Sequence, residues 1–261
     1  MVPRVLEVAV STEERQDVLM APRLPPLLPR PIGFAHRGAR AHAQENTLKA
    51  FDLALRLGAT GLESDVWITV DGHPVLDHDG VLGRRPRRRR IADMKRSELP
   101  EHIPTLAEFY DRVGTNHPFS LDMKDVAAFD AVIGTARNAG GDAEDNLWLC
   151  HWVLGQLRDW REHTSAKLVD STRLSKIKEG AERRANEQRN LGIDAVNLRV
   201  NDWNGGLVAL FHRYDRVAFG WDAQHHRQIA SLIDAGIDGV FSDHVDRLTE
   251  TINQFFPTAA P

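Results

Sequence analysis

Cysteine is nearly absent from this sequence of 261 residues: Cys150 stands alone, so no disulfide can form within the chain. Long apolar runs are also missing, since no stretch approaches the roughly 20 residues that a membrane-spanning helix requires. The N-terminal region includes Glu13, Glu14 and Asp17 and lacks the apolar core and cleavage site of a signal peptide. We therefore expect a cytoplasmic protein without stable membrane insertion.

The chain also lacks an excess of basic charge. Its 33 Lys and Arg against 37 Asp and Glu give a formal net charge of −4, which argues against a nucleic-acid partner. The one basic run extends from Arg84 to Arg90 and is interrupted only by Pro86. We interpret this run as a solvated loop, with recruitment of an anionic partner such as a membrane surface as the alternative. The sequence does not indicate the oligomeric state.

The length suits one α/β barrel, which typically has about 250 residues, or two small domains. With 42% hydrophobic and 27% charged residues, the composition is typical of a globular protein. Residues 1–31 are proline-rich at 22–31, which predicts an extended N-terminal arm. Residues 32–256 form the predicted folded domain.

From residue 32 onward, short apolar runs alternate with helical patterns, as in a parallel sheet. Strands are predicted at residues 32–35, 61–69, 119–123, 147–150, 167–169, 195–198, 216–219 and 239–241. Helices are predicted at residues 47–57, from 105 onward, and at 127–138, 155–163, 175–191, 207–214, 225–235 and 247–255. Asn46 is the expected N-cap of the first helix and Gly58 its end, and Thr105 and Glu108 have the spacing of a capping box in the second.

Residues 74–78 are a further strand candidate, separated from the second strand only by the turn at Asp71 and Gly72. A parallel partner would need a crossover of about a dozen residues or more, so this segment is predicted to be a hairpin arm. The remaining strands close a (β/α)8 TIM barrel, an α/β fold, with a short hairpin insertion after strand 2. The alternative is an open doubly wound sheet, but no Gly-rich nucleotide loop follows the first strand.

Carboxylates occupy alternating positions of the second predicted strand. The side-chain period of two places Glu63 and Asp65 on one face and apolar side chains on the other. Inward-facing carboxylates are costly unless a divalent cation or buried arginines neutralise them. Asp122 and Lys124 share a face of the third strand in the same way. They complete a three-carboxylate cage with a lysine for a phosphate oxygen, or they form a structural ion pair.

Two histidines are candidates for proton transfer, because an imidazole has a pKa of about 6.5. His36 and Arg37 end the first strand, at the edge of the predicted sheet where barrel active sites lie. Arg37 offers a planar fork for a phosphate. His78 closes the hairpin, whose return predicts a position over the barrel mouth opposite His36. The alternative for each is a hydrogen-bonded structural histidine at a strand end.

Taken in order, these segments resemble the glycerophosphodiester phosphodiesterase family. The matching motifs are A-H-R-G at 35–38, E-N-T-x-x-A-F at 45–51, G-x-E-x-D-V at 61–66, T-x-D-G at 69–72 and H-D at 78–79. Further matches are I-P-T-L at 103–106, L-D-M-K at 121–124, G-W at 220–221, G-I-D-G at 236–239 and S-D at 242–243. The resemblance covers residues 32–247 and is loose between 126 and 215.

The resemblance implies an eight-stranded barrel that hydrolyses deacylated phospholipids to glycerol 3-phosphate and an alcohol with the help of one divalent cation, Mg²⁺ or Ca²⁺. The implied roles are an acid/base pair of His36 and His78, metal ligands Glu63, Asp65 and Asp122, phosphate contacts from Arg37 and Lys124, a glycerol contact from Trp221, and support of the His36 loop by Glu45 and Asn46. The small-molecule glycerophosphodiester is the expected partner.

Three departures from the family pattern concern specificity. Asp122 stands where the family usually has a glutamate, the run from Arg84 to Arg90 replaces a Thr/Gly-rich segment, and Asp222 follows Trp221 in place of a threonine. Two other functions are alternatives. A lysophospholipase D-like phosphodiesterase acting on lysophospholipids would need a wider apolar mouth. A catalytically silent phosphodiester-binding module would have lost ligands or a histidine, whereas every motif position is filled here.

Overall fold

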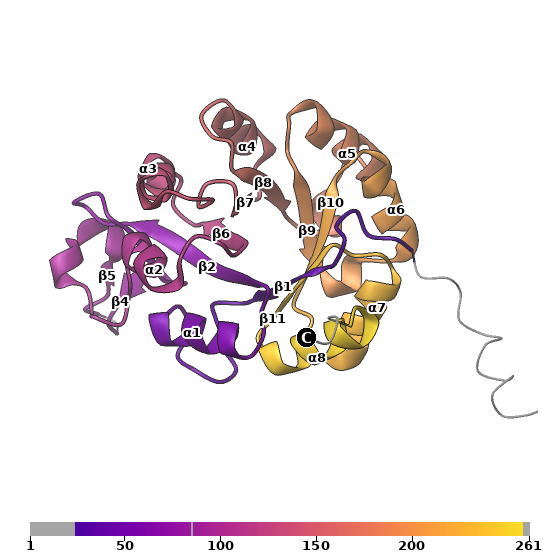
Figure 1. Ribbon diagram of the computed structural model, residues 1–261. Helices are drawn as coiled ribbons and strands as arrows, with labels where there is room; N and C mark the ends of the chain where they lie inside the picture. Colours follow the sequence, from indigo (N-terminus) through magenta and orange to yellow (C-terminus); the bar gives the residue numbers. More distant parts are fainter. Residues whose placement is uncertain (1–23, 85, 258–261) are drawn as a thin grey trace, which may run out of the picture.

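Parallel strands form a closed barrel in the computed structural model, which describes residues 24–84 and 86–257 (Figure 1). The barrel strands are β1 (Ile32–Ala35), β2 (Gly61–Ile68), β6 (Phe119–Met123), β7 (Leu147–His151), β8 (Lys167–Ser171), β9 (Ala195–Arg199), β10 (Val217–Trp221) and β11 (Gly239–Ser242), in this order around the ring. Because β1 pairs in parallel with both β2 and β11, the ring of eight parallel strands is closed. The predicted (β/α)8 barrel is confirmed, and the open doubly wound sheet is wrong.

Helices surround the barrel on the outside (Figure 1). They are α1 (Leu48–Arg56), α2 (Leu106–Val113), α3 (Phe129–Ala139), α4 (Leu154–Arg161), α5 (Ala181–Asn190), α6 (Gly205–Arg213), α7 (His226–Asp234) and α8 (Val245–Phe255). The capping box of Thr105 and Glu108 at the start of α2 is confirmed. The predicted N-cap of α1 is wrong: Thr47 Oγ1, not Asn46, accepts the Ala50 N–H at 3.2 Å.

The helix predicted at 175–191 is wrong in its first part. Residues Leu174–Lys176 form a separate 3₁₀ turn, η4, and α5 begins only at Ala181. Gly180 has a φ of +90°, a left-handed conformation that a right-handed helix cannot contain. The residues before Gly180 therefore form a loop after β8, at the carboxyl end of the barrel.

The predicted hairpin after strand 2 is confirmed. β3 (Pro74–Leu76) runs antiparallel to the end of β2, with Val66 opposite Leu76 and Ile68 opposite Pro74. A second small hairpin follows, made of β4 (Val81–Leu82) and β5 (Arg89–Arg90). The basic run lies in this second hairpin, where its described members are exposed.

The barrel interior is filled by a cluster of aromatic and aliphatic side chains below the carboxyl ends of the strands. Phe34, Trp148, Phe219 and Phe241 belong to it, and the rings of Phe34 and Phe241 stack with centroids 4.4 Å apart. Each such side chain contributes about 1.5–3 kcal/mol when it is fully buried. Larger apolar clusters lie between the strands and the surrounding helices. The barrel strands are therefore packed on their inner face by this cluster and on their outer face by the helices.

Part of the predicted N-terminal arm lies at the amino end of β11. The backbone N–H groups of Leu27 and Leu28 donate to Asp238 Oδ1 at 2.6 and 3.0 Å, and Asp238 is fully buried. Arg30 Nη1 donates to the carbonyl of Phe256 at 2.7 Å. This segment thus contacts the end of the barrel opposite to the carboxyl ends of the strands. Residues 1–23 of the arm lie outside the described residues.

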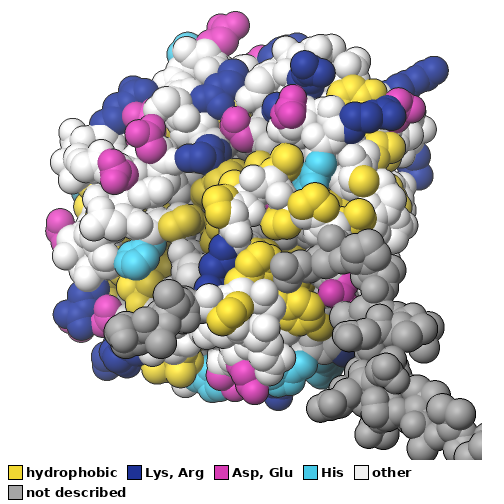
Figure 2. Space-filling model, turned by 45° about the vertical axis from the view of Figure 1, so that its right-hand side comes forward, with side chains coloured by type: hydrophobic (Ala, Val, Ile, Leu, Met, Phe, Trp, Pro, Cys, Tyr) yellow, Lys and Arg dark blue, Asp and Glu magenta, His cyan; other side chains and the backbone are white. Residues whose placement is uncertain are grey.

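Within residues 24–84 and 86–257, no helix combines the length and the apolar character needed to cross a membrane. On the face shown in Figure 2, Lys and Arg side chains are interspersed with Asp and Glu. This face therefore offers no continuous surface of one sign of charge.

Glu144, in the loop before β7, connects three segments and gives a test of the fold. Its carboxylate accepts from Arg137 Nε at 2.7 Å, from Thr164 Oγ1 at 2.6 Å and from the Ser165 N–H at 3.1 Å. The hydrogen bond from Arg137, helped by those from Thr164 and Ser165, lowers the pKa of Glu144 to about 2. We expect Glu144→Gln to lower the free energy of unfolding at pH 7 by about 1–3 kcal/mol in urea titrations.

The pKa of Glu144 is lower in the folded protein than in the unfolded chain. The contribution of Glu144 to the free energy of unfolding is therefore present above the unfolded pKa and is lost as the pH falls toward 2. The difference in free energy of unfolding between Glu144→Gln and the wild type should therefore become smaller as the pH falls from about 5 to about 2. The matched control is Glu162→Gln, at an exposed position. Equal destabilisation by the two substitutions at pH 7 would contradict this role of Glu144.

Candidate active site

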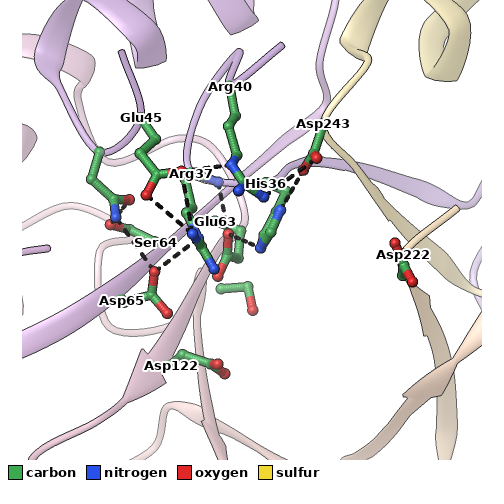
Figure 3. A network of polar contacts seen from close by, with 12 residues as sticks. His36, Arg37, Arg40, Glu45, Glu63, Ser64, Asp65, Asp122, Asp222 and Asp243 are labelled. Carbon is green, nitrogen blue, oxygen red and sulfur yellow. Dashed lines mark hydrogen bonds and ion pairs between the residues drawn. The ribbon is translucent and has the colours of Figure 1, made fainter. Parts of the chain in front are cut away.

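A cavity of about 930 Å³ opens at the carboxyl ends of the barrel strands. Its lining side chains come from every part of the ring and are mostly polar or charged. They include His36, Arg37, Glu63, Asp65, Asp122, Lys124, Arg173, Asn197, Trp221 and Asp243. Barrel enzymes have their active sites at this end. Figure 3 shows the polar network on the side of the cavity formed by β1 and β2.

Three carboxylates meet in this cavity. Glu63 and Asp65 are on β2 and only 5% and 1% exposed, and Asp122 lies beside Asp65 in the parallel register of β2 and β6. One ligand oxygen from each lies within 4.8 Å of the others. The prediction that these side chains share one inward face is confirmed: Leu121 and Met123, on the other face of β6, are buried among apolar side chains.

The cluster carries more negative charge than its neighbours neutralise. Burial raises the pKa of Glu63 to about 7; the charge of His36 counteracts this rise, and the charges of Asp65 and Asp122 add to it. Lys124 Nζ contacts Asp122 Oδ2 at 2.9 Å and Asp65 Oδ1 at 3.0 Å, and Arg37 Nε contacts Asp65 Oδ2 at 3.2 Å. Glu63 has no Lys or Arg side chain as an ion-pair partner among the described residues. Three converging oxygen ligands that lack a full countercharge fit a divalent cation such as Mg²⁺ or Ca²⁺.

His36 follows β1 and is held between two carboxylates. Its Nδ1 lies 2.5 Å from Asp243 Oδ1, and its Nε2 faces Glu63 Oε2 at 3.9 Å (Figure 3). Burial lowers the pKa of His36, but the charge of Glu63 and the hydrogen bond to Asp243 outweigh burial, and the net pKa is raised. Burial alone would raise the pKa of Asp243, whereas its hydrogen bond and charge interaction with His36 outweigh this and lower it. The Asp243 contact fixes the ring with Nε2 toward the carboxylate cluster.

A tight turn after β1 places Arg37 over the cluster. Arg37 has a φ of +52°, and its N–H donates to Glu63 Oε2 at 2.7 Å. Its guanidinium contacts Glu45 at 3.1 Å and Asp65 at 3.2 Å. Gly38 follows at a φ of +75°, where a Cβ atom would lie 2.8 Å from the backbone of Ala50. A side chain at that position would push the turn away from α1.

Glu45 and Asn46 contact this turn, as their predicted supporting role requires. The Asn46 N–H donates to the Arg37 carbonyl at 3.0 Å. The Asn46 side chain donates to Asp65 Oδ2 at 3.4 Å and accepts from Ser64 Oγ at 2.8 Å. Glu45 also pairs with Arg40 Nε at 2.5 Å, and Arg40 Nη1 reaches Asp243 at 3.4 Å. The turn that carries His36 is thus connected to both neighbouring strands.

His78 is the predicted site residue that this network does not include. The Asp77 N–H donates to the Asp65 carbonyl at 3.1 Å, so the chain passes beside β2 at this point. The His78 imidazole is 39% exposed, and its Nδ1 contacts Asp79 at 2.8 Å. Within the described residues it neither lines the cavity nor contacts the carboxylates. Its position opposite His36 stays a prediction.

The sequence predicts no role for Asp243, nor for Arg173 and Arg199 on the far side of the cavity. Asp243 directly follows β11, the strand beside β1, so its place at the carboxyl end of a neighbouring strand was the available signal. Trp221 lines the cavity as expected, but the guanidinium carbons of Arg173 and Arg199 lie 5.2 and 5.8 Å from its ring centre. The described members of the run from Arg84 to Arg90 do not line the cavity.

Comparisons with known proteins agree with this geometry. The pattern of the Glycerophosphoryl diester phosphodiesterase family matches residues 36–247. The chain is 24% identical over 238 residues to the glycerophosphodiester phosphodiesterase of Bacillus altitudinis, which covers 82% of this chain and 95% of that protein.

A shorter match is closer in sequence. It is 56% identical over 54 residues to the "Probable glycerophosphodiester phosphodiesterase 1" of Mycobacterium tuberculosis (strain CDC 1551 / Oshkosh), spanning 21% of this chain and only 20% of that relative's length. Among solved structures, a phosphodiesterase of Oleispira antarctica in complex with the product sn-glycerol-3-phosphate is 19% identical, with a TM-score of 0.75 over 86% of this chain and 97% of that one. Because the family pattern covers more than half of the sequence, the chain belongs to the glycerophosphoryl diester phosphodiesterase family.

Proposed function

We propose that this protein hydrolyses glycerophosphodiesters to glycerol 3-phosphate and an alcohol, and that the reaction requires a divalent cation. The observation that carries the proposal is the meeting of Glu63, Asp65 and Asp122 beside His36 in the cavity. Membership of the family supports it, and so does the product bound to the Oleispira antarctica protein. A cytoplasmic location is part of the proposal.

Glu63, Asp65 and Asp122 would hold the cation, either Mg²⁺ or Ca²⁺. When bound, the cation supplies positive charge against the negative charge that develops on the non-bridging phosphate oxygens. Lys124 and Arg37 line the same cavity and add donors for these oxygens. Contacts with Asp65 hold the Lys124 and Arg37 side chains in place before the substrate arrives, so these side chains need little reorganisation.

His36 and His78 are the proposed acid/base pair. One imidazole takes the proton from the attacking oxygen, which belongs to water or to the glycerol hydroxyl beside the phosphoester, and a new P–O bond forms. The bond to the leaving oxygen then breaks, and the other histidine protonates that oxygen. If the glycerol hydroxyl attacks, water must open the cyclic phosphate in a second step. Asp243 positions His36 through the 2.5 Å contact with Nδ1. His78 needs a side-chain rotation from its contact with Asp79 to take part.

The lining of the cavity favours a deacylated substrate over a lysophospholipid. Its apolar members are Trp152, Trp221 and Phe241, and its other residues are polar or charged. An acyl chain in this cavity would therefore lie against many charged and polar side chains, whose desolvation disfavours its binding. The silent binding module is disfavoured because the three proposed cation ligands and His36 all line the cavity, although His78 does not.

The proposal is tested by following the release of glycerol 3-phosphate. Glycerophosphocholine, glycerophosphoethanolamine, glycerophosphoglycerol and lysophosphatidylcholine are each incubated with the purified chain in Mg²⁺, Ca²⁺ or EDTA. Release from a deacylated substrate that stops in EDTA and returns with added cation supports the proposal. Full activity in EDTA contradicts the cation requirement, and preference for lysophosphatidylcholine supports the lysophospholipase D-like alternative.

A further inference from the structure

The side of the cavity that lies across the barrel from the carboxylate cluster is basic. In the closed ring, β9 lies opposite β2 and β8 lies opposite β1. Arg173 and Lys176, from the loop after β8, and Arg199, at the end of β9, line the cavity on this side. We call these three residues the cationic wall. A substrate whose phosphate lies at Glu63 and Asp65 would therefore have the group at its far end directed toward the cationic wall.

Two of the three charges in the cationic wall are uncompensated. Arg199 pairs with Asp222 Oδ2 at 2.7 Å. Arg173 and Lys176 are exposed and make no ion pair or hydrogen bond with an acidic side chain in the described part of the chain. Asp202 accepts the Leu174 N–H at 3.1 Å and so holds the backbone of this loop without neutralising either side chain. The wall therefore keeps two positive charges directed at the cavity contents.

The aromatic side chain on this wall does not suit a cationic group. A quaternary ammonium is usually bound against the face of an aromatic ring. The ring of Trp221, however, already has the guanidinium carbons of Arg173 and Arg199 at 5.2 and 5.8 Å. A choline or ethanolamine group placed there would be close to like charges, which disfavours its binding.

Asn197 adds a polar group on the same side of the cavity, on the strand that ends at Arg199. It is on β9, only 5% exposed, and lines the cavity. Its Oδ1 has no hydrogen-bond partner although it is buried. An unpaired buried acceptor is costly, and a hydroxyl donor of the substrate would satisfy it. A substrate with a hydroxyl group beside an anionic group therefore matches Asn197 and the neighbouring cationic wall.

We propose that the preferred substrate carries a second phosphate, on the part of the molecule that reaches across the cavity. The chemical class is a polyol that joins two phosphate groups, such as a short glycerol-phosphate oligomer. This inference rests on the proposed phosphodiesterase function and names its substrate class. Arg173 and Lys176 bind the second phosphate, and the cluster of Glu63, Asp65 and Asp122 marks the phosphate that reacts.

The test compares three substrates that differ in the charge of the group beyond the reacting phosphate. Glycerophosphocholine has a cation there, glycerophosphoglycerol is neutral, and bis(glycerophospho)glycerol has a second phosphodiester. We expect kcat/KM to be about tenfold higher for bis(glycerophospho)glycerol than for glycerophosphoglycerol at low salt, and lowest for glycerophosphocholine. At about 0.5 M salt this preference should narrow, because charges at an exposed wall are screened.

In the double variant Arg173→Gln/Lys176→Gln, kcat/KM for bis(glycerophospho)glycerol should be only about twice that for glycerophosphoglycerol. A factor of two remains because bis(glycerophospho)glycerol has two equivalent diesters. The matched control is Arg183→Gln/Lys178→Gln, which removes the same charges from exposed neighbouring positions that do not line the cavity. It should keep the wild-type ratio. If the control variant also loses its preference for bis(glycerophospho)glycerol, the preference comes from a general attraction of anions, and the inference is overturned.

The outcomes separate this inference from the proposed function. If glycerophosphocholine is hydrolysed as well as bis(glycerophospho)glycerol or better, the second-phosphate inference is overturned and the phosphodiesterase function stays intact. If the preference for bis(glycerophospho)glycerol over glycerophosphoglycerol is unchanged in Arg173→Gln/Lys176→Gln, the second-phosphate inference is also overturned and the phosphodiesterase function stays intact. Absence of glycerol 3-phosphate from all three substrates, with either cation, overturns the proposed function and this inference together.

Discussion

Replacing Glu63 by glutamine should lower kcat/KM for glycerophosphodiester hydrolysis by about 10³-fold or more, because a cation in this site is expected to supply several kcal/mol of charge stabilisation. Glutamine keeps the shape of the side chain and the oxygen that faces the Arg37 N–H, but it removes the negative charge. The measurement is release of glycerol 3-phosphate over a range of Mg²⁺ concentrations, together with calorimetric titration of the cation. Unchanged turnover in Glu63→Gln would show that the carboxylate does not hold a required cation.

The loss of activity should come without a loss of stability. Without the cation, burial raises the pKa of Glu63 to about 7, so the ionised form is held in the folded state at a cost. Glu63→Gln removes this cost and should unfold no earlier than the wild type in the absence of metal. Glu162→Gln, at an exposed position, is the matched control for the substitution itself and should keep wild-type activity.

The same raised pKa predicts a competition between protons and the cation. Below about pH 7, Glu63 holds a proton in the metal-free protein, and the cation must displace it. The Mg²⁺ concentration needed for half-maximal activity should therefore rise as the pH falls from 8 to 6. At most about a tenfold rise per pH unit is expected for one displaced proton. In Glu63→Gln this part of the pH dependence should disappear.

The carboxylate cluster could be predicted from the sequence because local rules determine most of it. The period of two along a strand places Glu63 beside Asp65, and it also separates Asp122 from Leu121 and Met123. Parallel pairing of β2 with β6 then brings Asp122 level with Asp65. The first step is local, and the second requires only that two strands consecutive in the barrel pair in parallel.

Features that depend on closure of the ring, or on left-handed backbone at single residues, could not be predicted in this way. Asp243 meets His36 only because β11 returns to pair with β1, more than 200 positions along the chain. The cationic wall depends on where α5 begins, whereas the sequence pattern predicts Gly180 inside a helix. Asn46 leaves its expected capping position because its left-handed backbone, at a φ of +55°, directs its side chain to Asp65 and Ser64. A long-range strand pairing determined the first of these positions, and left-handed backbone at single residues determined the other two.

Substituting alanine for His36 should reduce kcat by about 10²–10⁴-fold, the range for loss of a general acid or base. Its Nε2 faces the carboxylate cluster, and Asp243 holds its Nδ1. Asp243→Asn keeps the imidazole but weakens its positioning, so a smaller loss of about 10–100-fold in kcat is expected, with KM little changed. Steady-state kinetics on glycerophosphoglycerol measure both effects. Near-normal turnover in His36→Ala would exclude a role in proton transfer.

The partner role of His78 can be tested by changing the leaving group. His78→Ala should reduce the hydrolysis of glycerophosphoglycerol by about 10²–10⁴-fold if His78 protonates the leaving oxygen. A nitrophenyl ester of glycerol 3-phosphate needs no such proton, because nitrophenolate is a stable anion. On that substrate His78→Ala should recover most of its activity, whereas His36→Ala should stay impaired if His36 is the base. Recovery in His36→Ala instead would exchange the two roles, and equal impairment of His78→Ala on both substrates would show that its imidazole does not act as the acid.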